Sequence, residues 1–149
     1  MSDQFSSVDA AIRAFREGKV VIVVDAEDRE NEGDFICAAE DATAEAINFM
    51  ITHGRGQVCM SVLPDVASRL ELPMMVESNQ TPLGTAFTIP VDHVSARTGI
   101  TAVERAKAVS AILSTESSPH DFVRPGHLFP LVAKEGGVLR RAGHTEATI

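Results

Sequence analysis

The sequence predicts a mixed α+β fold, because segments with strand character alternate with segments of helical periodicity. Val20–Val24 is a run of five apolar, mostly β-branched residues, which predicts a fully buried strand. Thr43–His53 places its apolar residues at helical spacing, and Gln57–Leu63 again has strand character. The chain has 149 residues and is 44% hydrophobic, which fits a single globular domain over residues 1–149.

The net charge and the two cysteines limit the partners and the cellular compartment expected for this protein. The formal net charge of −8 argues against nucleic-acid or membrane partners, so an anionic substrate would need a local group of arginines or a metal ion. Cys37 and Cys59 lie in apolar surroundings without Cys-x-x-Cys spacing, which predicts buried free thiols in a reducing compartment. The sequence shows neither a long apolar run nor a basic-then-apolar leader, which predicts a soluble cytoplasmic protein.

The first helix is predicted just before the buried strand. Ser7 can cap a helix whose apolar residues from Val8 to Phe15 fall at helical spacing, and Gly18 marks its end. This helix contributes to the scaffold and carries no candidate site residue.

The stretch Asp25–Asp34 holds six carboxylates and one arginine, and a second candidate strand, Phe35–Ala39, follows it. The two strands can form a hairpin that displays this stretch at one end of a sheet. Neighbouring carboxylates repel one another unless a cation lies among them, and hard oxygen ligands suit Mg²⁺ or Mn²⁺ better than zinc. The alternative is a solvated acidic turn, since charge runs usually face water.

Three further elements are predicted in the middle of the chain. Pro64–Leu70 has the pattern of a short helix. Thr85–Ile89 alternates as a half-buried strand does, and Pro90 ends it. Thr101 and Glu104 have the spacing of a capping box at the start of another helix, which explains both residues without chemistry.

His127 is a candidate general acid-base. In Arg124–His127, the proline and glycine fix a turn that presents this histidine just before an apolar strand. Histidine has an ordinary pKa of about 6.5, so it can take and return protons near neutrality. The alternative is a structural polar group held by the turn.

The last segment combines a basic turn with a predicted helix start. A strand over Val138–Leu139 leads into a small-residue turn and then His144 and Thr145. Backbone amides at the helix start, the Arg141 guanidinium and the Thr145 hydroxyl make a candidate phosphate cradle. His144 can reach a metal ion held by Glu30. The alternative is a solvated basic turn.

Several segments together resemble the 3,4-dihydroxy-2-butanone 4-phosphate synthase family of riboflavin biosynthesis. Residues 29–34 are Arg-Glu-Asn-Glu-Gly-Asp, residues 72–79 are Leu-Pro-Met-Met-Val-Glu-Ser-Asn, and residues 143–147 are Gly-His-Thr-Glu-Ala. The resemblance covers nearly the whole chain. It implies a three-layer fold in which helices flank a mixed central sheet. It also implies a lyase that converts D-ribulose 5-phosphate into L-3,4-dihydroxy-2-butanone 4-phosphate and formate by Mg²⁺-dependent enolisation and skeletal rearrangement.

The resemblance further implies roles for individual residues. Glu30 and His144 would bind Mg²⁺ or Mn²⁺, and His127 would move protons. The residues that would hold the substrate are Arg29, Glu30, Asp34, Arg141, Ala142, Gly143, His144 and Thr145. Ribulose 5-phosphate and a second copy of the chain, in a homodimer with a shared active site, are the expected partners.

Two features depart from the family's pattern. Glu104 stands where the family has an aspartate. Family members continue past Ile149 with a helix, a strand and a glutamate that acts with the histidine, so the C-terminal portion of the domain is expected to be missing. The family is sometimes joined to a GTP cyclohydrolase II domain. The alternative to the lyase is therefore a non-catalytic fragment that retains metal and sugar-phosphate binding or dimer assembly.

Overall fold

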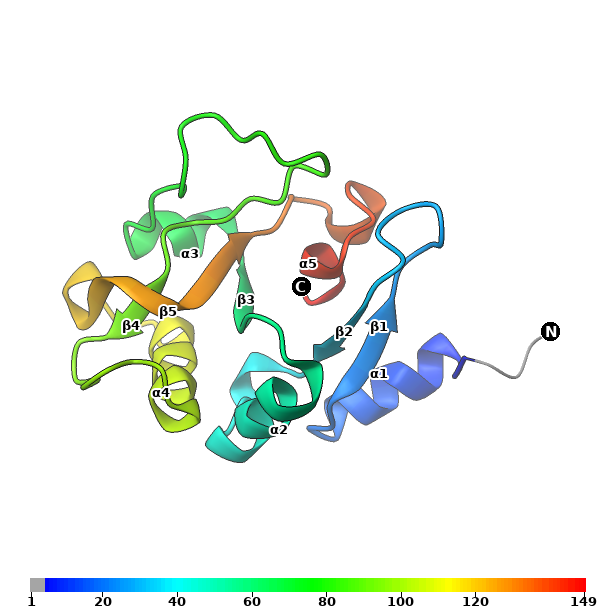
Figure 1. Ribbon diagram of the computed structural model, residues 1–149, viewed down its shortest axis with the longest axis horizontal. Coiled ribbons are helices and arrows are strands. Elements are labelled where there is room, and N and C mark those ends of the chain that lie inside the picture. The colour runs from blue at the N-terminus through cyan, green and yellow to red at the C-terminus, as the bar shows by residue number, and fades with distance from the viewer. Residues whose placement is uncertain (1–4) are drawn as a thin grey trace.

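A computed structural model describes residues 5–149 and confirms the mixed α+β fold (Figure 1). The strands form two sheets. β1 (Val21–Val24) and β2 (Gly33–Ile36) form the predicted antiparallel hairpin. β3 (Cys59–Val62), β5 (Phe122–Val132) and β4 (Val91–His93) form a mixed sheet with β5 in the middle, parallel to β3 and antiparallel to β4.

Five α-helices accompany the sheets in the described part of the chain, and the predicted caps are confirmed. The helices are α1 (Val8–Arg16), α2 (Ala44–Gly54), α3 (Pro64–Arg69), α4 (Ala102–Leu113) and α5 (His144–Ala147). The Ser7 hydroxyl caps α1 by accepting the Ala10 amide, and Thr101 and Glu104 form a capping box at the start of α4. None of the helices described in the structure is long and apolar enough to span a membrane.

The hydrophobic core lies around the three-stranded sheet. Leu70 of the α3 end, Val91 of β4, Ile112 of α4 and Leu128 of β5 are at most 1% exposed. Ile47 of α2 packs into the same cluster. Full burial of one such side chain stabilises the fold by about 1.5–3 kcal/mol, so this sheet and helices α2, α3 and α4 form the stable centre of the molecule.

The β1–β2 hairpin lies outside this core, and the prediction of a fully buried strand at Val20–Val24 is wrong. β1 alternates half-buried and exposed residues, with Ile22 64% and Val24 46% exposed. The reason is its pairing: within residues 5–149 β1 bonds only to β2, and its alternating burial shows that one face packs against other elements. In Figure 1 the hairpin lies at the right of the molecule, with α5 between it and β3.

Two predicted strands are also absent among the described residues. Thr85–Ile89 makes only isolated bridges, Phe87 to Leu131 and Thr88 to Met74. A regular ladder beside β5 fails there because Pro130 has no amide to donate, although its carbonyl accepts the Thr88 amide. Residues 137–139 form a 3₁₀ turn instead of a strand, and Leu139 is 97% exposed.

Candidate active site

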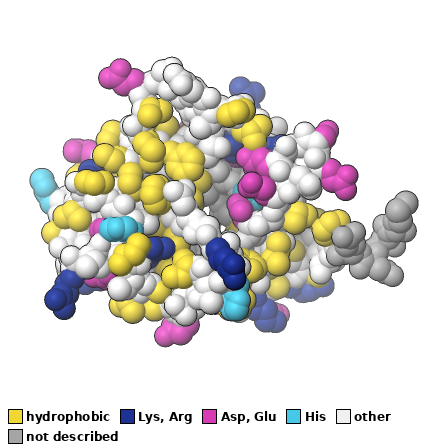
Figure 2. Space-filling view, in the orientation of Figure 1, with side chains coloured by type: hydrophobic (Ala, Val, Ile, Leu, Met, Phe, Trp, Pro, Cys, Tyr) yellow, Lys and Arg dark blue, Asp and Glu magenta, His cyan; other side chains and the backbone are white. Residues whose placement is uncertain are grey.

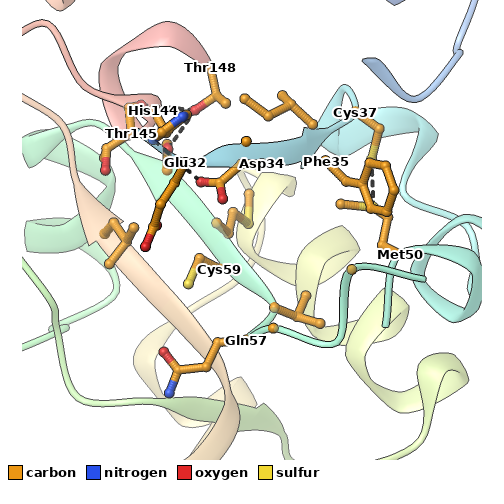
Figure 3. A pocket seen from close by; sticks show the side chains of 18 of the residues that line it. Glu32, Asp34, Phe35, Cys37, Met50, Gln57, Cys59, His144, Thr145 and Thr148 are labelled. Atoms are coloured by element: carbon orange, nitrogen blue, oxygen red, sulfur yellow. Dashed lines mark hydrogen bonds and ion pairs between the residues drawn. The ribbon is translucent and has the colours of Figure 1, made fainter. Parts of the chain in front are cut away.

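A cavity of about 790 Å³ opens between the β1–β2 hairpin, β3 and α5. In Figure 2, acidic side chains gather at the edge of a hollow on the right half of the face. Figure 3 shows Asp34 of β2, Cys59 of β3 and His144 of α5 arranged around this space. Six of the predicted site residues line the cavity: Arg29, Glu30, Asp34, Arg141, His144 and Thr145.

The Asp25 carboxylate organises the loop between β1 and β2. Its Oδ2 atom accepts hydrogen bonds from Arg29 Nη1 at 2.5 Å and from the Glu30 amide at 3.1 Å, and its Oδ1 atom accepts the Glu32 amide at 3.1 Å. Burial opposes ionisation of Asp25, but these hydrogen bonds outweigh it and lower the pKa of the carboxyl group to about 2. Arg29 Nη1 also donates to Glu30 Oε2 at 2.6 Å, so one guanidinium links two carboxylates.

His144 faces these carboxylates across the cavity. Its Nδ1 atom lies 3.5 Å from Glu30 Oε2 and 3.7 Å from Asp34 Oδ2, and only 10% of the side chain is exposed. Its Nε2 atom is buried and has no hydrogen-bond partner within residues 5–149.

The spacing of these side chains fits a divalent cation. One ligand atom each from Asp25, Glu30 and His144 lie within 4.8 Å of one another. Two neighbouring ligands of an octahedral Mg²⁺, at about 2.1 Å from the ion, lie about 3 Å apart, which is close to the separation between Glu30 and His144. One imidazole and two carboxylates form a donor set that Mg²⁺ or Mn²⁺ accepts.

Two guanidinium groups meet at Gly143, the residue before α5. A Cβ atom at this position would lie 3.0 Å from Arg29 Nη2 and would overlap Arg141 Nη1. A side chain at this position would have to push at least one guanidinium group aside. The two arginines bring positive charge to a cavity that otherwise carries carboxylates, next to the histidine of the candidate metal site.

Arg141 is held mainly by protein groups. Its Nη1 atom donates to Glu146 Oε2 at 2.6 Å, its Nε and Nη2 atoms donate to the Leu83 carbonyl, and Nη2 also donates to Thr85 Oγ1. The Glu146 side chain is 1% exposed and also accepts the Lys134 amide. Through these hydrogen bonds Arg141 links the Leu83–Thr85 segment to the cavity wall. Its Nη1 atom keeps one N–H beyond these contacts, because each terminal guanidinium nitrogen carries two.

The helix expected after the basic turn is a single turn, α5, in which Thr145 is buried. Ala142 and Gly143 precede it but are not among the cavity-lining residues. The phosphate cradle predicted here therefore rests mainly on side chains, since a four-residue helix has almost no dipole.

Cys59 also differs from its prediction, because it is exposed to the cavity instead of buried. The cavity walls still remove the thiol from bulk water. This desolvation, together with the nearby Asp34 carboxylate, raises the pKa of Cys59 to about 11. The thiol is therefore protonated near neutrality and is a poor nucleophile. Cys37 is half-buried, and burial raises the pKa of its thiol as well.

His127 lies apart from this cavity, in β5, and is not among its lining residues. The predicted turn over residues 124–127 is wrong, because these residues belong to the strand. The irregularity that proline and glycine introduce appears instead as a register shift between β4 and β5 at Val91 and Asp92. Asp92 holds His127 through two hydrogen bonds, and the histidine side chain is 41% exposed.

The loop before α4 is organised by Glu104. This carboxylate accepts the amides of Arg97, Thr98 and Thr101, and the hydroxyls of both threonines. The Arg97 amide makes the largest contribution, and together the hydrogen bonds outweigh desolvation and lower the pKa of Glu104 to about 2. Glu104 therefore does more than cap the helix.

Sequence reasoning did not single out Asp25, Asp92 or Glu146. Asp25 lies in the acidic stretch, and its position directly after a strand was an available signal. Glu146 belongs to the Gly-His-Thr-Glu-Ala motif, in which it was not given a role. Asp92 is separated from His127 by more than thirty residues, and nothing in its neighbouring sequence indicates their contact.

Comparisons with known proteins all point to the same family. The family model described as 3,4-dihydroxy-2-butanone 4-phosphate synthase matches residues 9–149. The riboflavin biosynthesis protein RibBA of Bacillus subtilis (strain 168) is 55% identical over 145 residues, which cover 97% of this chain and 36% of that protein. The RibBA protein of Bacillus mycoides is 57% identical over the same length and coverage. The chain thus spans about a third of the length of these curated relatives.

Solved structures give the same picture. A crystal structure of 3,4-dihydroxy-2-butanone 4-phosphate synthase in complex with two magnesium ions is 44% identical, with a TM-score of 0.93, and the match covers 97% of this chain and 68% of that one. RibBX of A. baumannii, a two-domain synthase of the same name, is 45% identical with a TM-score of 0.90, and the match covers 96% of this chain and 42% of that one.

Proposed function

The chain belongs to the 3,4-dihydroxy-2-butanone 4-phosphate synthase family, and on this premise we propose that it is the lyase of that name. It would convert D-ribulose 5-phosphate into L-3,4-dihydroxy-2-butanone 4-phosphate and formate in riboflavin biosynthesis. One observation carries the proposal: Arg29, Glu30, Asp34, Arg141, His144 and Thr145, from segments far apart in the sequence, line one cavity. The hydrophobic core cluster of the described residues supports their assignment to one synthase domain.

Glu30 and His144 would hold Mg²⁺ or Mn²⁺, with Asp25 beside them. The separation of their ligand atoms supports this assignment. A divalent ion bound there would stabilise the negative charge that develops on substrate oxygens during enolisation and rearrangement. The protein's own part is to hold the ligands ready, and the hydrogen bonds from the loop amides to Asp25 support that role for the loop.

Arg29 and Arg141 would bind the sugar phosphate. Arg29 uses Nη1 for Asp25 and Glu30, and its Nη2 atom points toward Gly143 and makes no hydrogen bond within the described residues. Arg141 keeps one N–H on Nη1. Convergence of two guanidinium groups beside Gly143 therefore supports a phosphate site. Thr145, which lines the cavity, would complete its wall, and Ala142 would contribute from its position next to Gly143.

Asp34 would contact the substrate hydroxyls from the hairpin side. Its side chain is 53% exposed and lines the cavity, so it remains accessible to a ligand. A carboxylate there can accept hydrogen bonds from sugar hydroxyls, and this supports its predicted role in substrate binding.

His127 would move protons, but from a second copy of the chain. It does not line the cavity of its own chain, and its side chain is 41% exposed. Exposed apolar residues lie on the segments around it: Val94, Ile100, Val103 and Val123 are 44–66% exposed. A homodimer that covers this face and places His127 at the partner's cavity would explain both observations.

The experiment is a formate-release assay of the purified chain with ribulose 5-phosphate and Mg²⁺. We expect formate release that stops with EDTA and falls on the order of 10³-fold in Glu30→Gln, because a metal ligand supplies several kcal/mol of transition-state stabilisation. Asp28→Asn, in the same loop but exposed, is the matched control and should retain activity.

Three outcomes would contradict the proposal. Formate release that persists in EDTA would exclude the metal site. Binding of ribulose 5-phosphate without any turnover would favour the non-catalytic fragment. Failure to bind ribulose 5-phosphate in the presence of Mg²⁺ would exclude the substrate site in this cavity.

A further inference from the structure

Asp92 of β4 holds His127 through both of its carboxylate oxygens. Oδ1 accepts the His127 backbone amide at 2.9 Å, and Oδ2 lies 2.8 Å from His127 Nδ1. The Asp92 side chain is only 8% exposed, whereas the His127 side chain is 41% exposed. A buried carboxylate therefore contacts both the backbone amide and one ring nitrogen of His127, while the histidine side chain stays partly exposed.

The packing around this pair leaves Asp92 little freedom to move. A Cβ atom on Gly126 would overlap the backbone of Val91 and Asp92. A Cβ atom on Gly99, which has a φ of +79°, would overlap the Asp92 carboxylate itself. Gly126 thus lets β5 approach the backbone at Asp92, and Gly99 lets its own segment approach the Asp92 carboxylate. The Gly99 segment is in turn fixed by the hydrogen bonds to Glu104.

A carboxylate offers only acceptors, so the ring nitrogen that contacts Asp92 must carry a hydrogen. In the neutral imidazole the other nitrogen, Nε2, then has the free lone pair. We propose that Asp92 is a positioning residue that fixes His127 as the Nδ1–H tautomer, so that Nε2 is the atom that accepts a proton from the sugar phosphate. The catalytic part of this inference rests on the proposed function, whereas the tautomer does not.

Replacement of Asp92 by asparagine should reverse the tautomer. The backbone N–H of His127 needs an acceptor, so the amide oxygen of asparagine should take the place of Oδ1. The amide NH₂ then faces His127 Nδ1 and donates to it. The ring proton must move to Nε2, and the atom that served as the base becomes a donor.

The test is a ¹⁵N NMR measurement of the His127 ring at a pH where the imidazole is neutral, in the chain without substrate. We expect the Nδ1–H tautomer in the wild type and the Nε2–H tautomer in Asp92→Asn. Asp65→Asn, an exposed aspartate in α3, should leave the tautomer unchanged. Thermal unfolding of each variant checks that it folds. If Asp92→Asn does not fold, the wild-type tautomer alone decides, since an Nε2–H ring in the wild type would overturn the proposal.

Kinetics supply the second measurement. Formate release by Asp92→Asn should show kcat lowered by about 10²–10⁴-fold with KM little changed, because loss of a correctly protonated base removes that much catalysis. A variant with the wild-type tautomer or with wild-type kcat would overturn the positioning role. An inactive wild type whose tautomer reverses in Asp92→Asn would overturn the proposed function and support the orientation of His127 by Asp92.

Discussion

The β1–β2 hairpin and the β3–β5–β4 sheet both carry proposed active-site residues, but they are stabilised by different means. None of the residues of α1 or β1, all of which the structure describes, is buried, and β2 buries only Ile36. The three-stranded sheet contains Val91 and Leu128, both fully buried. The proposed metal and phosphate residues Arg29 and Glu30 therefore depend on polar contacts in a poorly buried hairpin. The His127 side chain is also held by a polar contact, with Asp92, but it lies on a strand that the core fixes.

In both regions a carboxylate that accepts backbone amides shapes a loop. Asp25 accepts the amides of Glu30 and Glu32, and Glu104 accepts those of Arg97, Thr98 and Thr101. Each of these carboxyl groups has a pKa of about 2. The comparison shows that side-chain hydrogen bonds can set loop geometry whether or not the loop lies on a packed sheet.

Deletion of apolar atoms should separate the two regions most clearly. Leu128→Ala should lower the free energy of unfolding by about 2–5 kcal/mol, because it leaves a cavity in the core. Ile22→Ala should lower it by about 0.5 kcal/mol or less, because the side chain is 64% exposed. Urea denaturation of both variants measures the difference. Equal losses would show that the hairpin is as much a part of the core as the sheet.

A smaller effect should appear in the pH dependence of stability. The pKa of Glu104 is lowered from 4.5 to about 2 in the folded protein, so the unfolded chain binds its proton more readily. The stability that Glu104 contributes is present above about pH 4.5 and is lost as the pH falls toward about 2. The unfolding free energy of Glu104→Gln should therefore decrease less over this range than that of the wild type.

Urea titrations at several pH values measure this slope. Glu116→Gln, at an exposed position, is the matched control and should keep the wild-type slope. A Glu104→Gln slope equal to that of the wild type would mean that the hydrogen bonds to Glu104 do not persist in solution. Folding also lowers the pKa of other carboxyl groups, such as those of Asp25 and Asp121. These groups contribute equally to the slopes of the wild type and the variant, so their contributions cancel in the comparison.

Local sequence signals predicted the local features of the fold well. The hairpin around Asp25–Asp34 and the caps at Ser7 and Thr101 depend on neighbours in the sequence, and the structure confirms them. The prediction that β1 is fully buried was wrong, because hydrophobicity shows that a strand can be buried but does not show which element covers it. The prediction of a strand at Thr85–Ile89 was wrong because its pairing is limited by Pro130, a residue far away in the sequence.

The same distinction applies to the candidate site. The residues placed in the cavity were found through short motifs that carry several of them together, and their roles stay predictions. The contact between Asp92 and His127 and the ion pair between Glu146 and Arg141 depend on how strands and turns pack in the folded chain. No pattern in the neighbouring residues records such contacts.

The most direct test of the central claim, that the His127 region of one copy completes the cavity of another, is complementation between two inactive variants. Glu30→Gln and His127→Asn chains carrying different tags would be co-expressed and the mixed dimers isolated. The isolated mixed dimers should release formate at about half the wild-type rate, because each contains one intact site out of two; the unfractionated random mixture should reach about a quarter. Mixed dimers without activity, or chains that remain monomeric, would contradict a shared active site.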